Sequence, residues 1–187
     1  MRRRIFVAIN LPENIKKRLV EFKERWFDLP VRWTKKDSLH LTLVFIGYVG
    51  ESGLYEVCRT VRNVAQNFEP FFLTYDKIIY GPPGHPPRMI WLLGRVNQTL
   101  AEIKQKTEES LLEIENLNSF RLERRPFSPH ITLARIKNQD WGETKNLPKI
   151  EQDFKATLSV TTIDVMESDL RGDGAEYTIL ESCPLGE

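Results

Sequence analysis

Hydrophobic and polar positions follow two different periods along the chain, and each period predicts a different element. The apolar run "RIFVAIN" at residues 4–10 predicts a buried strand, and Pro12 suits the first turn of a helix that follows it. Residues 13–29 carry apolar side chains at helical spacing, which predicts an amphipathic helix. A short extended piece at 31–34 and the strand "LHLTLVFIG" at 39–47, ended by a glycine, complete this segment.

The same order of elements recurs in the second half of the chain. Residues 88–94 again form a short apolar run, and Asn97 is a plausible N-cap for a helix that reaches residue 117. The extended polar piece "FRLERRPFSP" and the strand "HITLARI" at 130–136 follow. Strand, long helix, polar piece and strand therefore occur twice, which indicates an internal repeat.

Further elements flank the repeated units. Ser52 is a candidate cap for another amphipathic helix. The remaining predictions are a strand at 71–81, a short helical piece within 138–150, one long strand at 154–168 and a closing strand at 176–185.

These elements predict an α+β fold built by pseudo-twofold duplication, with two antiparallel sheets, helices on their outer faces and a central cleft. We expect one bilobal domain over residues 1–187, with approximate repeat halves 1–80 and 88–187 and terminal strands that can exchange between the lobes.

Composition narrows the class of protein. With 187 residues, 41% of them hydrophobic, the chain is long enough for a sizeable core, and 27 basic against 26 acidic residues give no excess charge for duplex or membrane-surface binding. Cys58 and Cys183 lie far apart in the sequence and show no CxxC or Cys/His ligand spacing, so nothing in the sequence supports a zinc site or a disulfide framework. The apolar run after "MRRR" is too short for a signal peptide, and we expect a cytoplasmic monomer.

The two repeated strands share the pattern His–apolar–Thr–Leu, at His40 and at His130. Because side chains alternate along a strand, each histidine shares a face with the threonine two residues on, Thr42 or Thr132, while the leucine-type residues face the core. Two such strands, packed around a twofold axis, would line one cleft with two His-Thr pairs. The third histidine, His85, lies in a proline-rich segment and is expected to be exposed.

Such a cleft suits acid–base chemistry at a phosphodiester. Histidine can be neutral or protonated near neutral pH, so one copy can accept a proton from water while the other donates one to a departing oxygen. The threonine hydroxyls can donate to phosphate oxygens. This design needs no metal and no cofactor.

Strand alternation also makes a prediction for the fifth residue after each histidine. Phe45 and Arg135 fall on the core face, opposite the histidines. Phe45 is therefore expected in the core, with stacking on a base as the alternative. Arg135 reaches the histidine face only if the strand bulges or ends before it.

At these residues the sequence resembles the two-histidine (2H) phosphoesterase superfamily, in its branch of RNA 2',3'-cyclic phosphodiesterases and bacterial-type 2'-5' RNA ligases. The resemblance covers most of the chain, including "RIFVAINLPENIKKRL", "VRWTKKDSLHLTLVFIG", "PPRMIWLLG", "RPFSPHITLARI" and "SDLRGDGAEYTIL". It implies metal-independent hydrolysis of a terminal RNA 2',3'-cyclic phosphate to a 2'-phosphomonoester. It implies His40 as proton donor, His130 as proton acceptor, and Thr42, Thr132 and Arg135 as substrate-binding residues.

Several alternatives remain open at the level of sequence. The same histidines would serve a 2'-5' RNA ligase that joins tRNA halves, a hydrolase of another small cyclic phosphate, or a non-catalytic RNA- or nucleotide-binding module. Basic stretches precede both motifs, and they are either solvated loops or a patch that steers an RNA end, with Trp33 as a stacking surface. The residues of that patch would be Arg32, Lys35, Arg124 and Arg125.

Overall fold

The computed structural model describes residues 2–26, 28–115, 117, 120–123, 126–136, 147–171 and 174–186. Its elements run, in chain order, β1 (Arg3–Asn10), α1 (Glu13–Glu24), β2 (Val31–Trp33), the 3-10 turn η1 (Lys36–Ser38), β3 (His40–Val49), α2 (Glu51–Ala65), β4 (Phe71–Gly81), β5 (Met89–Gly94), α3 (Gln98–Leu112), β6 (His130–Ile136), β7 (Glu151–Val160), β8 (Thr162–Arg171) and β9 (Gly174–Pro184). The predicted α+β class is confirmed.

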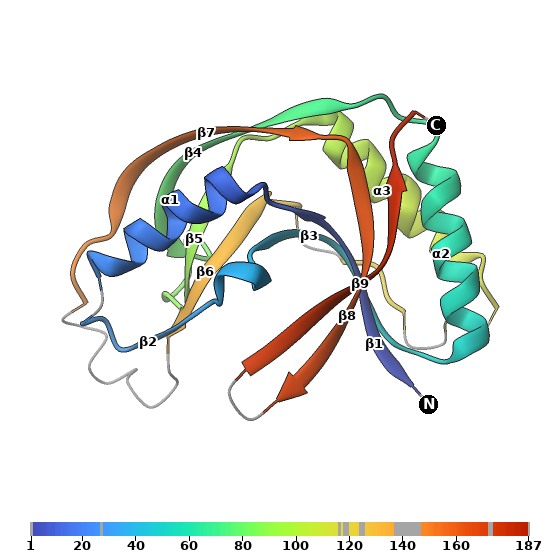
Figure 1. Cartoon of the computed structure of the whole chain (residues 1–187), viewed down its shortest axis with the longest axis horizontal. Coiled ribbons are helices and arrows are strands. Elements are labelled where there is room, and N and C mark those ends of the chain that lie inside the picture. Colours follow the sequence, from blue (N-terminus) through green and yellow to red (C-terminus); the bar gives the residue numbers. More distant parts are fainter. Residues whose placement is uncertain are drawn as a thin grey trace.

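The strands form one continuous sheet where the sequence predicts two. Their order is β7-β4-β5-β6-β3-β1-β8-β9, with β2 paired to β6 outside this path (Figure 1). All the pairs are antiparallel, and the two halves of the sheet meet where β3 pairs with β6 at Leu41 and Ile131. The sheet is therefore a joined pair of four-stranded halves, and the motif strands are its two central strands.

The strand order is symmetric about that junction. β3 corresponds to β6, β1 to β5, β8 to β4 and β9 to β7, and both β1 and β5 lead into a helix. The C-terminal part of the chain contributes strands to both outer edges. The single long strand expected at 154–168 is consequently wrong, because the chain leaves β7 at Val160 and enters β8 at Thr162, in the opposite half.

Two of the predicted helix starts can be compared with the structure. Asn97 caps α3, and its side-chain oxygen accepts a hydrogen bond from the Leu100 amide at 2.8 Å, as predicted. The Ser52 cap is wrong, since α2 begins at Glu51 after Gly50. Most of the helical piece expected within 138–150, residues 138–146, lies outside the described residues.

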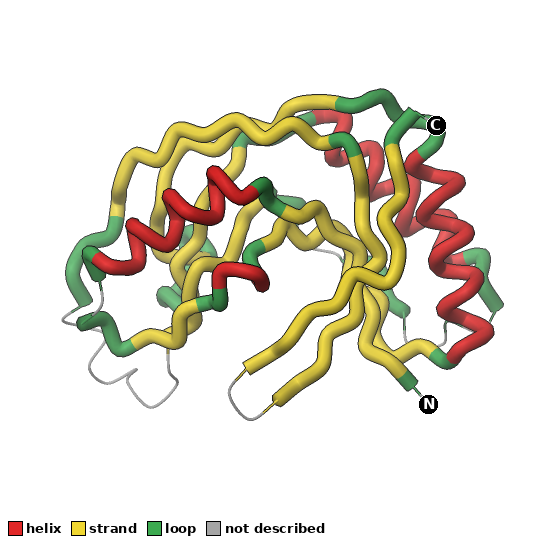
Figure 2. Tube along the Cα trace, in the orientation of Figure 1, coloured by secondary structure: helices red, strands yellow, loops and turns green. Residues whose placement is uncertain are grey.

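α1 and α3 each pack on the half of the sheet opposite to the one that contains the strand before them. α1 follows β1, yet its Arg18 guanidinium lies 4.4 Å from the ring centroid of Phe154 on β7, in the other half. α3 follows β5 but packs against α2 and β3, and α2 packs against β8 and β9. Figure 2 shows α1 beside one half and the other two helices beside the other half. In the described part of the chain, no helix is long and apolar enough to span a membrane.

Candidate active site

The junction of the sheet brings the two predicted motifs together. β3 begins at His40 and β6 begins at His130. The next residue of each strand, Leu41 or Ile131, pairs with the other across the junction, and both are fully buried in the core. Their neighbours on both strands, the two histidines with Thr42 and Thr132, are half-buried. Because alternate residues of a strand point to opposite faces, these four side chains share the face opposite the core.

A bulge in each motif strand changes the direction of the side chains beyond the threonine. Thr42 pairs with Ala8 but Val44 pairs with Val7, so β3 carries an extra residue at Leu43. Such an extra residue reverses the faces of the side chains after it. Phe45 is 63% exposed, and its placement in the core was therefore a wrong prediction.

The same bulge occurs in β6, at Leu133, between the pairs Thr132–Trp91 and Ala134–Ile90. It turns Arg135 to the face of Thr132. An Arg135 Nη lies 3.5 Å from the Met89 sulfur, and the Thr132 hydroxyl oxygen lies 4.0 Å from the same sulfur. Strand alternation allowed Arg135 to reach the histidine face only if the strand bulges or ends before it, and the bulge at Leu133 meets this condition.

Each histidine is oriented by the carbonyl two residues before it. Nδ1 of His40 lies 2.8 Å from the Ser38 carbonyl oxygen, and Nδ1 of His130 lies 2.8 Å from that of Ser128. A carbonyl can only accept, so Nδ1 carries the hydrogen in both rings and donates it. Nε2 is then the atom that exchanges protons, and in His40 it lies 3.1 Å from the Thr42 hydroxyl.

Aromatic rings hold the two imidazoles in place. The ring centroids of Phe6 and Tyr177 lie 5.0 and 4.8 Å from that of His40, and Trp91 stacks on His130 at 3.7 Å. None of these three residues was predicted from the sequence. Phe6 and Trp91 lie in apolar strands that are typical of a core, and only the strand register shows that Phe6, Ala8 and Trp91 face the motif residues.

Burial lowers the pKa of His40 from its ordinary 6.5 to about 4. The hydrogen bond to the Ser38 carbonyl opposes this effect, and the positive charges of Arg135, His130 and Lys16 add to it. The pKa of His40 thus responds to Arg135 and His130, which come from the other motif. In the free protein at neutral pH, His40 is neutral.

This lowered pKa predicts a pH-dependent contribution to stability. Between pH 6.5 and 4 the unfolded chain binds a proton at His40 that the folded chain does not, so the free energy of unfolding falls as pH falls through this range. We expect wild type to lose on the order of 2–3 kcal/mol more than His40→Gln over this interval. Urea unfolding at several pH values measures the difference. His85→Gln, which removes an exposed histidine, should follow wild type, and equal slopes for wild type and His40→Gln would contradict the prediction.

The other predicted residues are distributed around this site. His85 is exposed, as expected. Arg32 is exposed on β2, directly across from Arg135. Trp33 packs against the core beside Phe22, with ring centroids 6.3 Å apart, which favours packing over RNA stacking. Arg124 and Arg125 lie outside the described residues.

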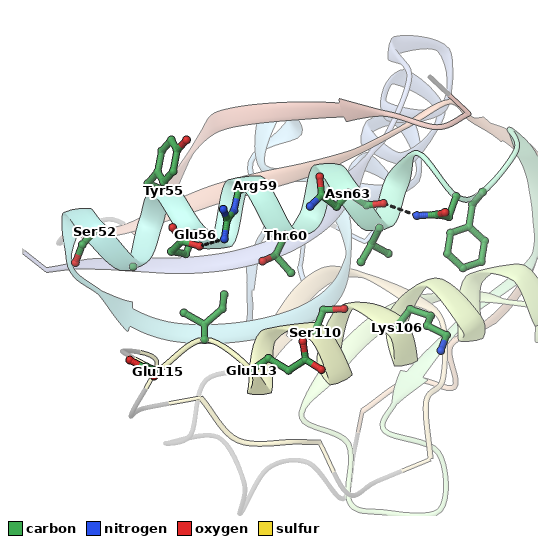
Figure 3. A pocket seen from close by; sticks show the side chains of 15 residues that line it. Ser52, Tyr55, Glu56, Arg59, Thr60, Asn63, Lys106, Ser110, Glu113 and Glu115 are labelled. Atoms are coloured by element: carbon green, nitrogen blue, oxygen red, sulfur yellow. Dashed lines mark hydrogen bonds and ion pairs between the residues drawn. The ribbon is translucent and has the colours of Figure 1, made fainter.

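A large hollow elsewhere on the molecule contains none of these residues. It lies between α2 and α3, and Figure 3 shows Tyr55, Thr60 and Asn63 along one wall and Ser110 along the other. Arg59 in this hollow is hydrogen-bonded to Glu56. The hollow brings together no pair of histidines and no bulged strands, so the junction of the sheet is the candidate active site.

A sheet duplicated about two central strands, each presenting a histidine and a threonine on the same face, is the arrangement of the two-histidine phosphoesterases. The family model described as LigT-like phosphoesterase matches residues 9–91 and 95–175. The chain belongs to this family.

Curated relatives and solved structures agree with that assignment. A protein of Methanocaldococcus jannaschii named RNA 2',3'-cyclic phosphodiesterase is 30% identical over 95% of this chain and 98% of its own length. A Thermotoga maritima protein of the same name is 27% identical over 96% of this chain and 94% of its own length. The crystal structure of TT0787 of Thermus thermophilus matches with a TM-score of 0.83 at 26% identity, covering 98% of each chain. E. coli LigT in its apo form shares the fold, with a TM-score of 0.78 at 23% identity over 100% of this chain and 99% of that one.

Proposed function

We propose that this protein hydrolyses the 2',3'-cyclic phosphate at the end of an RNA chain to a 2'-phosphomonoester. The observation that carries the proposal is the pair of histidines on one face of the sheet, each with Nδ1 hydrogen-bonded to a carbonyl, which makes Nε2 the nitrogen that exchanges a proton. The relatives that share nearly the whole chain are named for this activity. In this proposal the protein acts as a cytoplasmic monomer on RNA ends, tRNA fragments among them, with no metal.

In the proposed reaction His130 Nε2 takes a proton from the attacking water as its oxygen bonds to phosphorus. The bond between phosphorus and the 3'-oxygen breaks, and His40 Nε2 delivers a proton to that oxygen. The products are a 2'-phosphomonoester and a free 3'-hydroxyl, with one proton consumed at His40 and one gained at His130. This division of roles follows the family resemblance, because the two motifs are nearly equivalent by symmetry.

The low pKa of His40 is consistent with a donor that becomes charged only with substrate. An anionic phosphate between the two imidazoles favours the protonated form of His40 and offsets part of the cost of burial. In this proposal Thr42 and Thr132 donate to phosphate oxygens, and Arg135 supplies a positive charge near them. Phe45, exposed on the same face, offers a stacking surface for a base.

The proposal is tested with an RNA oligonucleotide that ends in a 2',3'-cyclic phosphate, incubated with the protein in excess EDTA. We expect hydrolysis at the same rate as without chelator, and a product that carries a 2'-phosphate. An untouched end would contradict the proposed activity, and loss of turnover in EDTA would contradict its independence from metal. A 3'-phosphate product would reverse the choice of the leaving oxygen.

A further inference from the structure

A buried carboxylate lies on β8, the strand that pairs with β1 on the side away from the junction. Asp164 on β8 is only 3% exposed, and it accepts hydrogen bonds from Asn10 Nδ2 at 2.7 Å and from the Ser182 hydroxyl at 2.6 Å. Asn10 is the strand partner of His40 across β1 and β3. Partners in adjacent strands project from the same face, so Asn10 and His40 lie side by side on the open face of the sheet.

These contacts determine which way the Asn10 amide points. A carboxylate can only accept, so the amide nitrogen faces Asp164. The same nitrogen lies 3.5 Å from the sulfur of Met166, which is also on β8. Because the oxygen and the nitrogen of an amide diverge from the same carbon, the Asn10 amide oxygen does not face Asp164. No hydrogen bond to this oxygen occurs among the residues that the structure describes.

The fold does not require a polar pair at the positions of Asn10 and Asp164. In the other half, the strand partner of His130 is Leu93, and the position that corresponds to Asp164 is occupied by Ile79, which pairs with Trp91 as Asp164 pairs with Ala8. Equivalent register is thus built with apolar side chains there. Asp164 forms no ion pair within the described chain, and a buried carboxylate without a cation is costly. The asymmetry points to a role specific to the His40 side.

We propose that Asn10 is a product-binding residue whose amide oxygen accepts a hydrogen bond from the hydroxyl formed at the leaving ribose oxygen. This inference rests on the proposed function. In the cyclic phosphate that oxygen is an ester oxygen without a hydrogen, so it offers nothing to Asn10. Once His40 Nε2 has transferred its proton and the P–O bond has broken, the new O–H can donate to Asn10. Asp164 and Ser182 act through Asn10 by holding its amide in this orientation.

The test compares two product analogues by calorimetry, which needs no turnover. Adenosine 2'-phosphate carries the 3'-hydroxyl, and 3'-deoxyadenosine 2'-phosphate lacks it. We expect wild type to bind the first about 3- to 10-fold more tightly, as for one neutral hydrogen bond. The double variant Asn10→Leu, Asp164→Ile copies the apolar pair of the other half and should bind both compounds with equal affinity.

Affinity for the 3'-deoxy compound serves as the control for folding, since it should be the same in wild type and in the variant. Asn10→Ala, at a half-buried position that water can reach, gives a second variant with the same expected loss of discrimination. Discrimination that survives in a folded variant, or a wild type that binds both analogues equally, would overturn the inference while leaving the proposed hydrolysis intact. Failure of wild type to bind either analogue would count against the proposed function itself.

Discussion

His40→Gln and His130→Gln should each lower kcat/KM for an RNA 2',3'-cyclic phosphate by about 10²- to 10⁴-fold. Glutamine keeps a polar side chain of similar size but cannot exchange a proton near neutral pH. In the proposed reaction the acid and the base act in one transition state, so the double variant should lose much less than the product of the two single losses. Initial rates over a range of RNA concentrations measure these effects.

His85→Gln is the matched control, because it removes the exposed histidine of the loop between β4 and β5 and should leave turnover unchanged. Melting curves of all variants show whether they remain folded. Full activity in either motif variant would exclude that histidine from the chemistry.

The two roles can be separated with a phosphodiester whose leaving group is nitrophenol. This leaving group departs without protonation, so the variant that lacks the general acid should lose far less on it than on RNA. We expect this smaller loss of activity for His40→Gln and not for His130→Gln. The opposite pattern would exchange the roles assigned to the two histidines.

The second large effect is expected for Arg135→Met, with a loss of about 10²-fold in kcat/KM. The bulge at Leu133 turns the guanidinium to the face of Thr132, and its charge is felt at His40. In the proposed function this charge stabilises the phosphate in the transition state, so its removal should lower kcat as well as weaken binding. Steady-state kinetics on the cyclic RNA separate the two contributions.

Arg59→Met provides the comparison for Arg135, since Arg59 is an exposed arginine on α2 in the outer hollow. It should have no effect on turnover. A loss in Arg135→Met no larger than in Arg59→Met would show that the bulge does not bring Arg135 to the reacting phosphate.

Much of the architecture follows from local patterns in the sequence. The apolar runs predict β1 and β5, helical spacing predicts α1 and α3, and the Asn97 cap is found where it is expected. The repeated His–apolar–Thr–Leu pattern places each histidine on the face opposite its leucines, because a strand of period two leaves no other arrangement. The sequence by itself thus determined the α+β class, the duplication and which residues share a face within each motif.

The register between strands distant in sequence was decided only by the tertiary structure. A bulge at Leu43 or Leu133 adds one residue to a strand, and nothing in the local period of apolar residues marks it. It moved Phe45 out of the core and brought Arg135 to the histidine face. Pairing likewise split residues 151–171 between opposite halves of the sheet and set Asn10 beside His40. Such pairings depend on backbone hydrogen bonds and packing between segments up to about 150 residues apart, such as Asn10 and Asp164, whereas side-chain periodicity reports only on neighbours along the chain.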